Sequence, residues 1–140
     1  MDIDLALLLP LIAFALWAVV LQICLLIERA RSMRSAKRAI NTFKATGDTE
    51  ALDAVSRAHM NTVENLPVFA VVYLCAIWTG SAAPIETLGW VAFGARAVQS
   101  CIHMISRSPA AVRVRALMLG VQAVCFVWLA AAAIRTILGV

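Results

Sequence analysis

Four long runs of apolar residues divide this 140-residue sequence, and they limit the folds open to it more than any other feature. The runs cover residues 5–27, 66–83, 88–105 and 116–134. A helix needs about 20 residues to cross a bilayer, and each run approaches or exceeds that length. Charged residues are only 14% of the chain, against about 25% in soluble domains. The sequence therefore predicts an all-α membrane protein, a single domain over residues 1–140 that forms a bundle of four transmembrane helices.

Residues that start or stop helices set the expected boundaries. They are Thr46, Gly47, Asp48 or Thr49, Pro84, Ser108 and Pro109. The expected helices span about residues 4–44, 48–79, 84–106 and 109–138. Pro67 lies inside the second helix and is expected to kink it, because proline removes one backbone hydrogen bond.

Lys and Arg are distributed unevenly between the apolar runs. No basic residue precedes Arg29, many lie between Arg29 and Arg57, segment 79–87 has none, and segment 106–115 is again basic. Because cytoplasmic loops carry an excess of Lys and Arg, both termini are predicted to be non-cytoplasmic. Only Arg135, near the end of the last helix, does not fit this orientation. Orientation and anionic lipid headgroups account for these charges, so no nucleic-acid partner is expected. The acidic start and long first run indicate a retained helix rather than a signal peptide.

The cysteines, one in each run, show no paired or metal-ligand spacing. We expect Cys24, Cys75, Cys101 and Cys125 to be packing residues, and we expect no metal.

Two sets of polar residues stand out, because a charge at the centre of a membrane helix costs about 2.5–3.5 kcal/mol. Arg57, Asn61 and Glu64 share one face of the second helix by their spacing. Arg96, Gln99 and His103 likewise share one face of the third helix by their spacing. The two faces can form a polar pocket in the cytoplasmic half of the bundle.

Such a pocket suits a small peptide-like anion with a free amine, or an anionic lipid headgroup. Guanidinium groups bind carboxylates in a bidentate manner, and the carboxylate of Glu64 can take an ammonium. A purely structural role is the alternative, in which Glu64 neutralises Arg96 or Arg57 and joins helices.

Residues 57–69 read R-A-H-M-N-T-V-E-N-L-P-V-F. This segment resembles the signature R-A-x-x-N-x-x-E-x-x-x-x-F of the membrane-associated proteins in eicosanoid and glutathione metabolism (MAPEG), most closely the microsomal glutathione transferase branch. Residues 94–96 resemble the G-A-R of that branch's third helix, and residues 100–103 and 112–115 resemble bacterial members.

The resemblance implies a homotrimer in a bacterial inner membrane, with glutathione bound between subunits on the cytoplasmic side. It assigns glutathione contacts to Arg57, Asn61, Glu64, Arg96, Gln99 and His103. An arginine of the neighbouring first helix is also implied, and Arg29, Arg31 and Arg34 remain open. Many members have tyrosine at the place of His103, and histidine or tyrosine at that of Gln99. Their absence argues against leukotriene and prostaglandin synthase activities.

The resemblance also implies an arginine that stabilises the glutathione thiolate. Arg113 falls near that position and Arg115 is the alternative. Arg113 is favoured because it lies one helical turn after Pro109, at the lipid boundary. A thiol with a pKa of about 8.5 needs such a positive charge, and the helix N-terminus adds to it.

The predicted function is that of a membrane-bound glutathione transferase, with peroxidase as an additional candidate activity and glutathione as co-substrate. Its second substrates would be hydrophobic electrophiles or lipid hydroperoxides from the surrounding lipids. The alternatives are a non-catalytic lipid- or glutathione-binding scaffold and a small transporter or bundle subunit.

Overall fold

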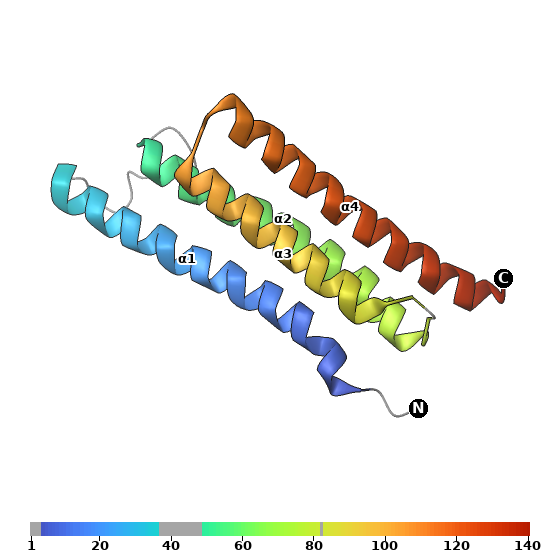
Figure 1. Cartoon of the computed structure of the whole chain (residues 1–140). Coiled ribbons are helices and arrows are strands. Elements are labelled where there is room, and N and C mark those ends of the chain that lie inside the picture. Colours follow the sequence, from blue (N-terminus) through green and yellow to red (C-terminus); the bar gives the residue numbers. More distant parts are fainter. Residues whose placement is uncertain (1–3, 37–48, 82) are drawn as a thin grey trace.

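The computed structural model describes residues 4–36, 49–81 and 83–140. Within these ranges the chain forms a short 3-10 turn, η1 (Leu5–Leu8), and four α-helices without a strand. The helices are α1 (Leu9–Ala36), α2 (Glu50–Trp78), α3 (Ile85–Ile105) and α4 (Pro109–Leu138). Successive helices run in opposite directions, so both ends of the chain lie at the same end of an elongated bundle (Figure 1). The prediction of an all-α fold is confirmed.

Local capping explains where α2 and α4 begin. The Thr49 hydroxyl accepts a hydrogen bond from the Leu52 N–H at 3.2 Å, and the Ser108 hydroxyl accepts one from the Ala111 N–H at 3.2 Å. Pro109 takes the first helical position, where its missing N–H costs nothing.

The predicted extension of the first helix over residues 37–44, and the alternative cap Asp48, lie outside the described residues. Helix α2 continues through Pro67 to Trp78, and the kink stays a prediction.

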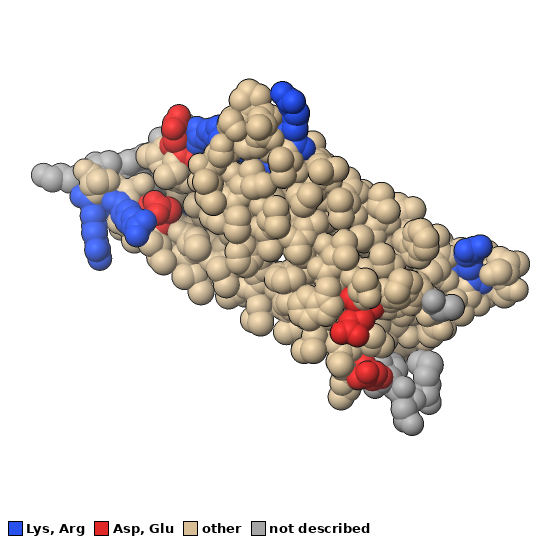
Figure 2. All heavy atoms as spheres, viewed as in Figure 1, with Lys and Arg blue, Asp and Glu red and all other residues tan. Residues whose placement is uncertain are grey.

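Three segments are long and apolar enough to cross a membrane, namely Leu5–Ser35, Glu50–Trp78 and Pro109–Leu138. Helix α3 is not among them. It has 21 residues, and Arg96, Gln99 and His103 lower its hydropathy. Figure 2 shows acidic and basic side chains gathered at the two ends of the visible face, with an uncharged band between them. Three of the four predicted spans are therefore supported by length and composition.

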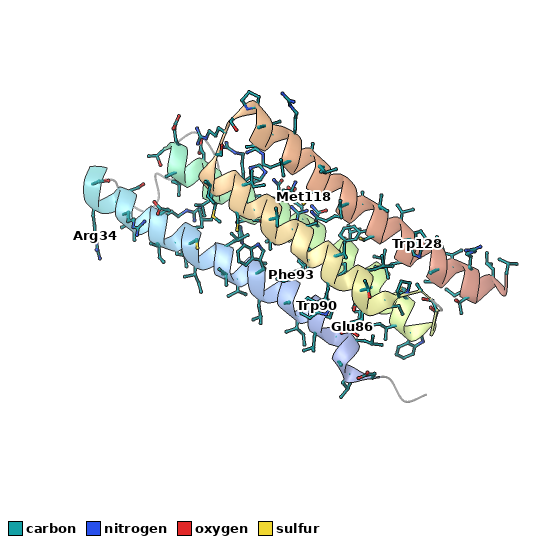
Figure 3. The ribbon with its side chains drawn as sticks, viewed as in Figure 1. Arg34, Glu86, Trp90, Phe93, Met118 and Trp128 are labelled. Atoms are coloured by element: carbon teal, nitrogen blue, oxygen red, sulfur yellow. The ribbon has the colours of Figure 1, made fainter. Side chains whose placement is uncertain are left out.

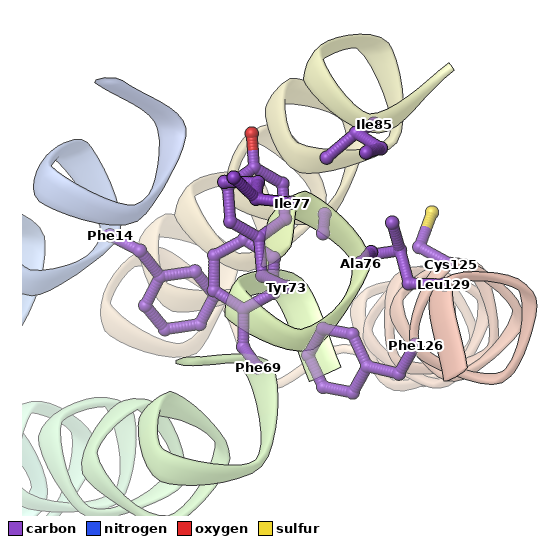
Figure 4. Close-up of a cluster of buried hydrophobic side chains, with 10 residues drawn as sticks. Phe14, Phe69, Tyr73, Ala76, Ile77, Ile85, Cys125, Phe126 and Leu129 are labelled. Carbon is purple, nitrogen blue, oxygen red and sulfur yellow. The ribbon is translucent and has the colours of Figure 1, made fainter. Parts of the chain in front are cut away.

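An aromatic core fixes the half of the bundle that contains the chain termini. The ring centroid of Phe69 lies 5.0 Å from that of Phe14 on α1 and 5.5 Å from that of Phe126 on α4. Figure 4 shows these three rings together with Tyr73 in the core. The Tyr73 hydroxyl donates a hydrogen bond to the Leu7 carbonyl at 2.7 Å, which ties η1 to α2. This core leaves the opposite end of the bundle for polar residues. Figure 3 shows Arg34 at that opposite end, and Glu86 at the end with the termini.

Gly89 allows α1, α2 and α3 to approach one another closely. A Cβ atom at this position would lie 2.6 Å from Tyr73 Cε2 and 2.8 Å from Pro10 Cβ.

We therefore predict that Gly89→Ala lowers the free energy of unfolding by about 1–3 kcal/mol, the usual cost of overpacking. Gly120→Ala is the matched control, because a Cβ there meets nothing within 4 Å. Thermal unfolding in detergent measures both, and equal stability of the two variants would contradict this close packing.

Candidate functional site

A polar cluster joins α2, α3 and α4 at the end of the bundle where α2 and α4 begin. His103 on α3 is its centre. One ring nitrogen, Nε2, lies 3.4 Å from Asn61 Nδ2 of α2, and the other, Nδ1, lies 3.4 Å from Arg115 Nη1 of α4. The same Arg115 nitrogen donates to the Ser106 carbonyl at 3.4 Å, just after α3 ends. We call Asn61, His103 and Arg115 the His103 cluster.

Arg115 determines which nitrogen of the His103 ring carries the hydrogen. A neutral imidazole has one acceptor nitrogen, whereas a guanidinium can only donate. Nδ1 therefore accepts from Arg115 and Nε2 carries the hydrogen. Because Asn61 Nδ2 and this N–H would both be donors, we assign the Asn61 amide the reverse orientation, with its oxygen toward Nε2, since the two ends of an amide are assigned from the hydrogen-bond network.

A second set of hydrogen bonds extends the network deeper between α3 and α4. The Gln99 amide donates to the Arg115 carbonyl at 3.1 Å, and the Gln122 amide donates to Gln99 Oε1 at 3.2 Å. Gln99 is 5% exposed and Gln122 is 0% exposed. Gln122 is absent from the sequence-based candidates. Its only signal there is a lone amide within an apolar run.

Helices α2 and α3 are joined by a separate buried pair. The hydroxyl oxygens of Thr62 and Ser100 lie 3.3 Å apart, and Thr62 also donates to the Ala58 carbonyl at 2.8 Å. Both residues are buried. This pair links the same two helices as Asn61 and His103 but makes no described bond to Arg115.

Arg96 is the deepest charge in the described structure, and only 1% of it is exposed. Its Nε and Nη2 atoms are buried and have no hydrogen-bond partner in the described part of the chain. Glu64 lies close enough to interact electrostatically with Arg96, but it is exposed and no ion pair within 4.0 Å joins the two among the residues described. A guanidinium buried in this way favours an anion nearby, because unpaired buried charge is costly.

Positive charge dominates this end of the bundle. Arg115, Arg57 and Arg96 all act electrostatically on His103. Arg57 is half-exposed and lies 4.0 Å from Asp53 one turn earlier on α2. A cavity of about 370 Å³ adjoins His103, lined also by Glu50, Ala54, Ser106 and Arg107. The ring therefore borders a space that opens at the basic end of the bundle.

The structure separates the sequence-predicted residues into two groups. It brings Asn61, Gln99, His103 and Arg115 into one hydrogen-bonded network. Glu64 and Arg113 are exposed, and no described contact joins Arg113 to this network.

On α1, Arg31 pairs with Glu28 at 2.6 Å, and the Nε of Arg29 is buried without a partner in the described ranges. The choice among Arg29, Arg31 and Arg34 stays open.

The sequence matches the MAPEG family over residues 7–134. This match covers most of the chain, and the protein therefore belongs to the MAPEG family, which includes glutathione transferases and related enzymes. The search among curated proteins finds no match. The family expected from residues 57–69 is confirmed, and its bacterial branch stays a prediction.

The unpaired guanidinium of Arg96 leads to a stability prediction. Replacing a buried charge by an apolar residue of similar size is often neutral or stabilising. We expect Arg96→Met to keep or raise the melting temperature in detergent without ligand, while removing the anion preference of the site. A loss of about 3–5 kcal/mol would instead show that Arg96 has a strong partner in the assembled protein, which would contradict a guanidinium held free for a ligand.

Proposed function

We propose that this protein is a membrane-bound glutathione transferase that activates the thiol of glutathione at the His103 cluster. The observation that carries the proposal is the guanidinium of Arg115, held against His103 at the basic end of a MAPEG bundle. This end offers cations for carboxylates and, in Glu64, an exposed carboxylate for an amine. Glutathione has two carboxylates, an ammonium and a thiol, and so matches that set of charges.

In this proposal, binding and activation fall to different residues. Arg57 and Arg96 attract the carboxylates, Glu64 takes the ammonium, and Asn61 adds an amide. Arg96 is buried, so it acts on the ligand through its charge or after a movement of its side chain. Gln99 and His103 line the inner wall. The ligand is thereby held without using the residue that faces the sulfur.

We assign thiolate stabilisation to Arg115 rather than Arg113. Arg115 is part of the network, whereas Arg113 is exposed. The two residues lie about 200° apart around α4, so one sulfur cannot face both. Arg115 also lies in the early turns of α4, where the helix N-terminus favours negative charge. The thiolate would then form a C–S bond with a hydrophobic electrophile from the bilayer and displace its leaving group. With a lipid hydroperoxide, two glutathione molecules would be oxidised to the disulfide while the hydroperoxide is reduced to the alcohol and water.

The assembly we propose is a homotrimer in a bacterial inner membrane, with α3 as the fourth span and both termini on the non-cytoplasmic side. Glu64 and half-exposed Arg57 support a shared site, because side chains turned out of one subunit can meet a neighbour. An arginine of the neighbouring α1 would complete the site.

A non-catalytic glutathione- or lipid-binding scaffold is the second candidate. It is favoured by Gln99, where many members have histidine or tyrosine, and by His103, where many members have tyrosine. Both nitrogens of His103 are engaged by protein groups, which leaves its ring less free for a ligand.

Loss of the binding charges should weaken glutathione binding. We predict that Arg57→Ala and Glu64→Ala each raise the Kd about tenfold or more, because hydrogen bonds to charged groups contribute about 1.5–3 kcal/mol. Arg135→Ala and Glu86→Ala, at the other end of the bundle, are the matched controls. Calorimetry measures the affinity, and native mass spectrometry checks that the trimer is recovered. Normal binding by both site variants would refute the assignment of these charges.

Loss of Arg115 should act on the sulfur. We predict that Arg115→Leu raises the pKa of the bound thiol by about one unit or more, which is about 1.4 kcal/mol per unit. Thiolate absorbance against pH measures this shift. Conjugation of a generic apolar electrophile should fall at neutral pH and recover partly at high pH. Arg113→Leu is the control, and a shift in that variant alone would return the role to Arg113.

A further inference from the structure

Gln122 is a buried amide in the middle of an otherwise apolar stretch of α4. It is 0% exposed and its amide nitrogen donates both to Gln99 Oε1 and to the Met118 carbonyl, at 3.2 Å each. Its own Oε1 is buried and unpaired among the described residues. An amide buried at membrane depth with one atom unpaired is costly, so its retention calls for a reason.

The geometry of the two amides supplies that reason. Arg115 and Gln122 lie seven residues apart and therefore on one face of α4. Gln99 lies between them on α3 and has to donate to the Arg115 carbonyl. An amide can be turned about its last bond, which exchanges its oxygen and nitrogen. The donor from Gln122 fixes the Gln99 oxygen on its own side, and the Gln99 NH₂ group is thereby directed at Arg115.

Arg115 is consequently held at both ends. Its carbonyl accepts from Gln99, while its guanidinium is placed against His103 and the Ser106 carbonyl. If the Gln99 amide turned over, two oxygens would face each other and this part of α4 would move away from α3.

We propose that Gln122 is a positioning residue for thiol activation, acting through Gln99 on Arg115. The inference rests on the proposed function, because it assumes that Arg115 faces the sulfur. The competing explanation is that the two glutamines only join helices, as polar pairs in membranes often do. The Thr62 and Ser100 pair provides the comparison, since it is equally buried and also joins two helices but is not bonded to Arg115.

The test compares Gln122→Leu with Ser100→Ala in the full-length protein with bound glutathione. We expect Gln122→Leu to raise the pKa of the bound thiol by about one unit, which is a tenfold fall in the ratio of thiolate to thiol at any fixed pH. Ser100→Ala should lower the melting temperature and leave that pKa unchanged. Gln22→Leu on α1 controls for the loss of a glutamine. Gln122→Met replaces Gln122→Leu if the leucine variant is not recovered as folded protein.

A double substitution tests whether Gln122 acts through Gln99. In a Gln99→Leu background, adding Gln122→Leu should not shift the thiol pKa further, because coupled residues are not additive. An unchanged pKa in Gln122→Leu, an equal shift in Ser100→Ala, or additive shifts in the double variant would each overturn the proposal.

A second readout separates this inference from the proposed function. If the wild-type protein binds no glutathione, the proposed function fails. The ¹⁵N signals of the His103 ring then report on the position of Arg115, because Nδ1 accepts its hydrogen bond. A changed Nδ1 signal in Gln122→Leu, with Ser100→Ala unchanged, supports the positioning role. An unchanged signal in Gln122→Leu overturns it.

Discussion

The bundle depends on satisfying the polar side chains that α3 places between α2 and α4. A polar group without a partner in the bilayer interior costs several kcal/mol. Asn61, Arg115 and Gln122 meet this need by pairing with His103 and Gln99. The aromatic core around Phe69 fixes the other end of the bundle mainly by ring packing, with the Tyr73–Leu7 hydrogen bond beside it. One end is therefore held mainly by shape and the other by directed hydrogen bonds.

The network that joins the helices also concentrates positive charge. Among the described residues, two nitrogens of buried Arg96 have no hydrogen-bond partner, and Arg57, Arg96 and Arg115 all act electrostatically on His103. A bundle that needed only helix adhesion would pair or omit such charges, since an unpaired buried cation opposes folding. An anion would complete this arrangement, and we propose that the anion is glutathione. Stability of the apo protein and affinity for the anion then depend on the same residues.

Features set by short-range chemistry could be predicted from the sequence. Ser108 followed by Pro109 identifies the start of α4 because capping involves only neighbouring residues. The choice between Arg113 and Arg115 needs the rotation of α4 about its axis, which depends on packing against α3. Gln122 was missed for a similar reason, since a single glutamine in an apolar run shows no partner until the helices are placed. Helix α3 is not among the three candidate spans because its polar residues, which belong to the candidate site, lower its hydropathy.

The central claim is that this protein binds glutathione as the thiolate, and proton release on binding tests it most directly. The free thiol is protonated at pH 7, because its pKa is near 8.5. Calorimetry at that pH in buffers of different ionisation enthalpy gives the number of protons released per site. We expect release approaching one proton with glutathione and none with S-methylglutathione, which has no thiol to ionise. Equal proton release for the two ligands, or binding of glutathione with no release, would contradict thiol activation.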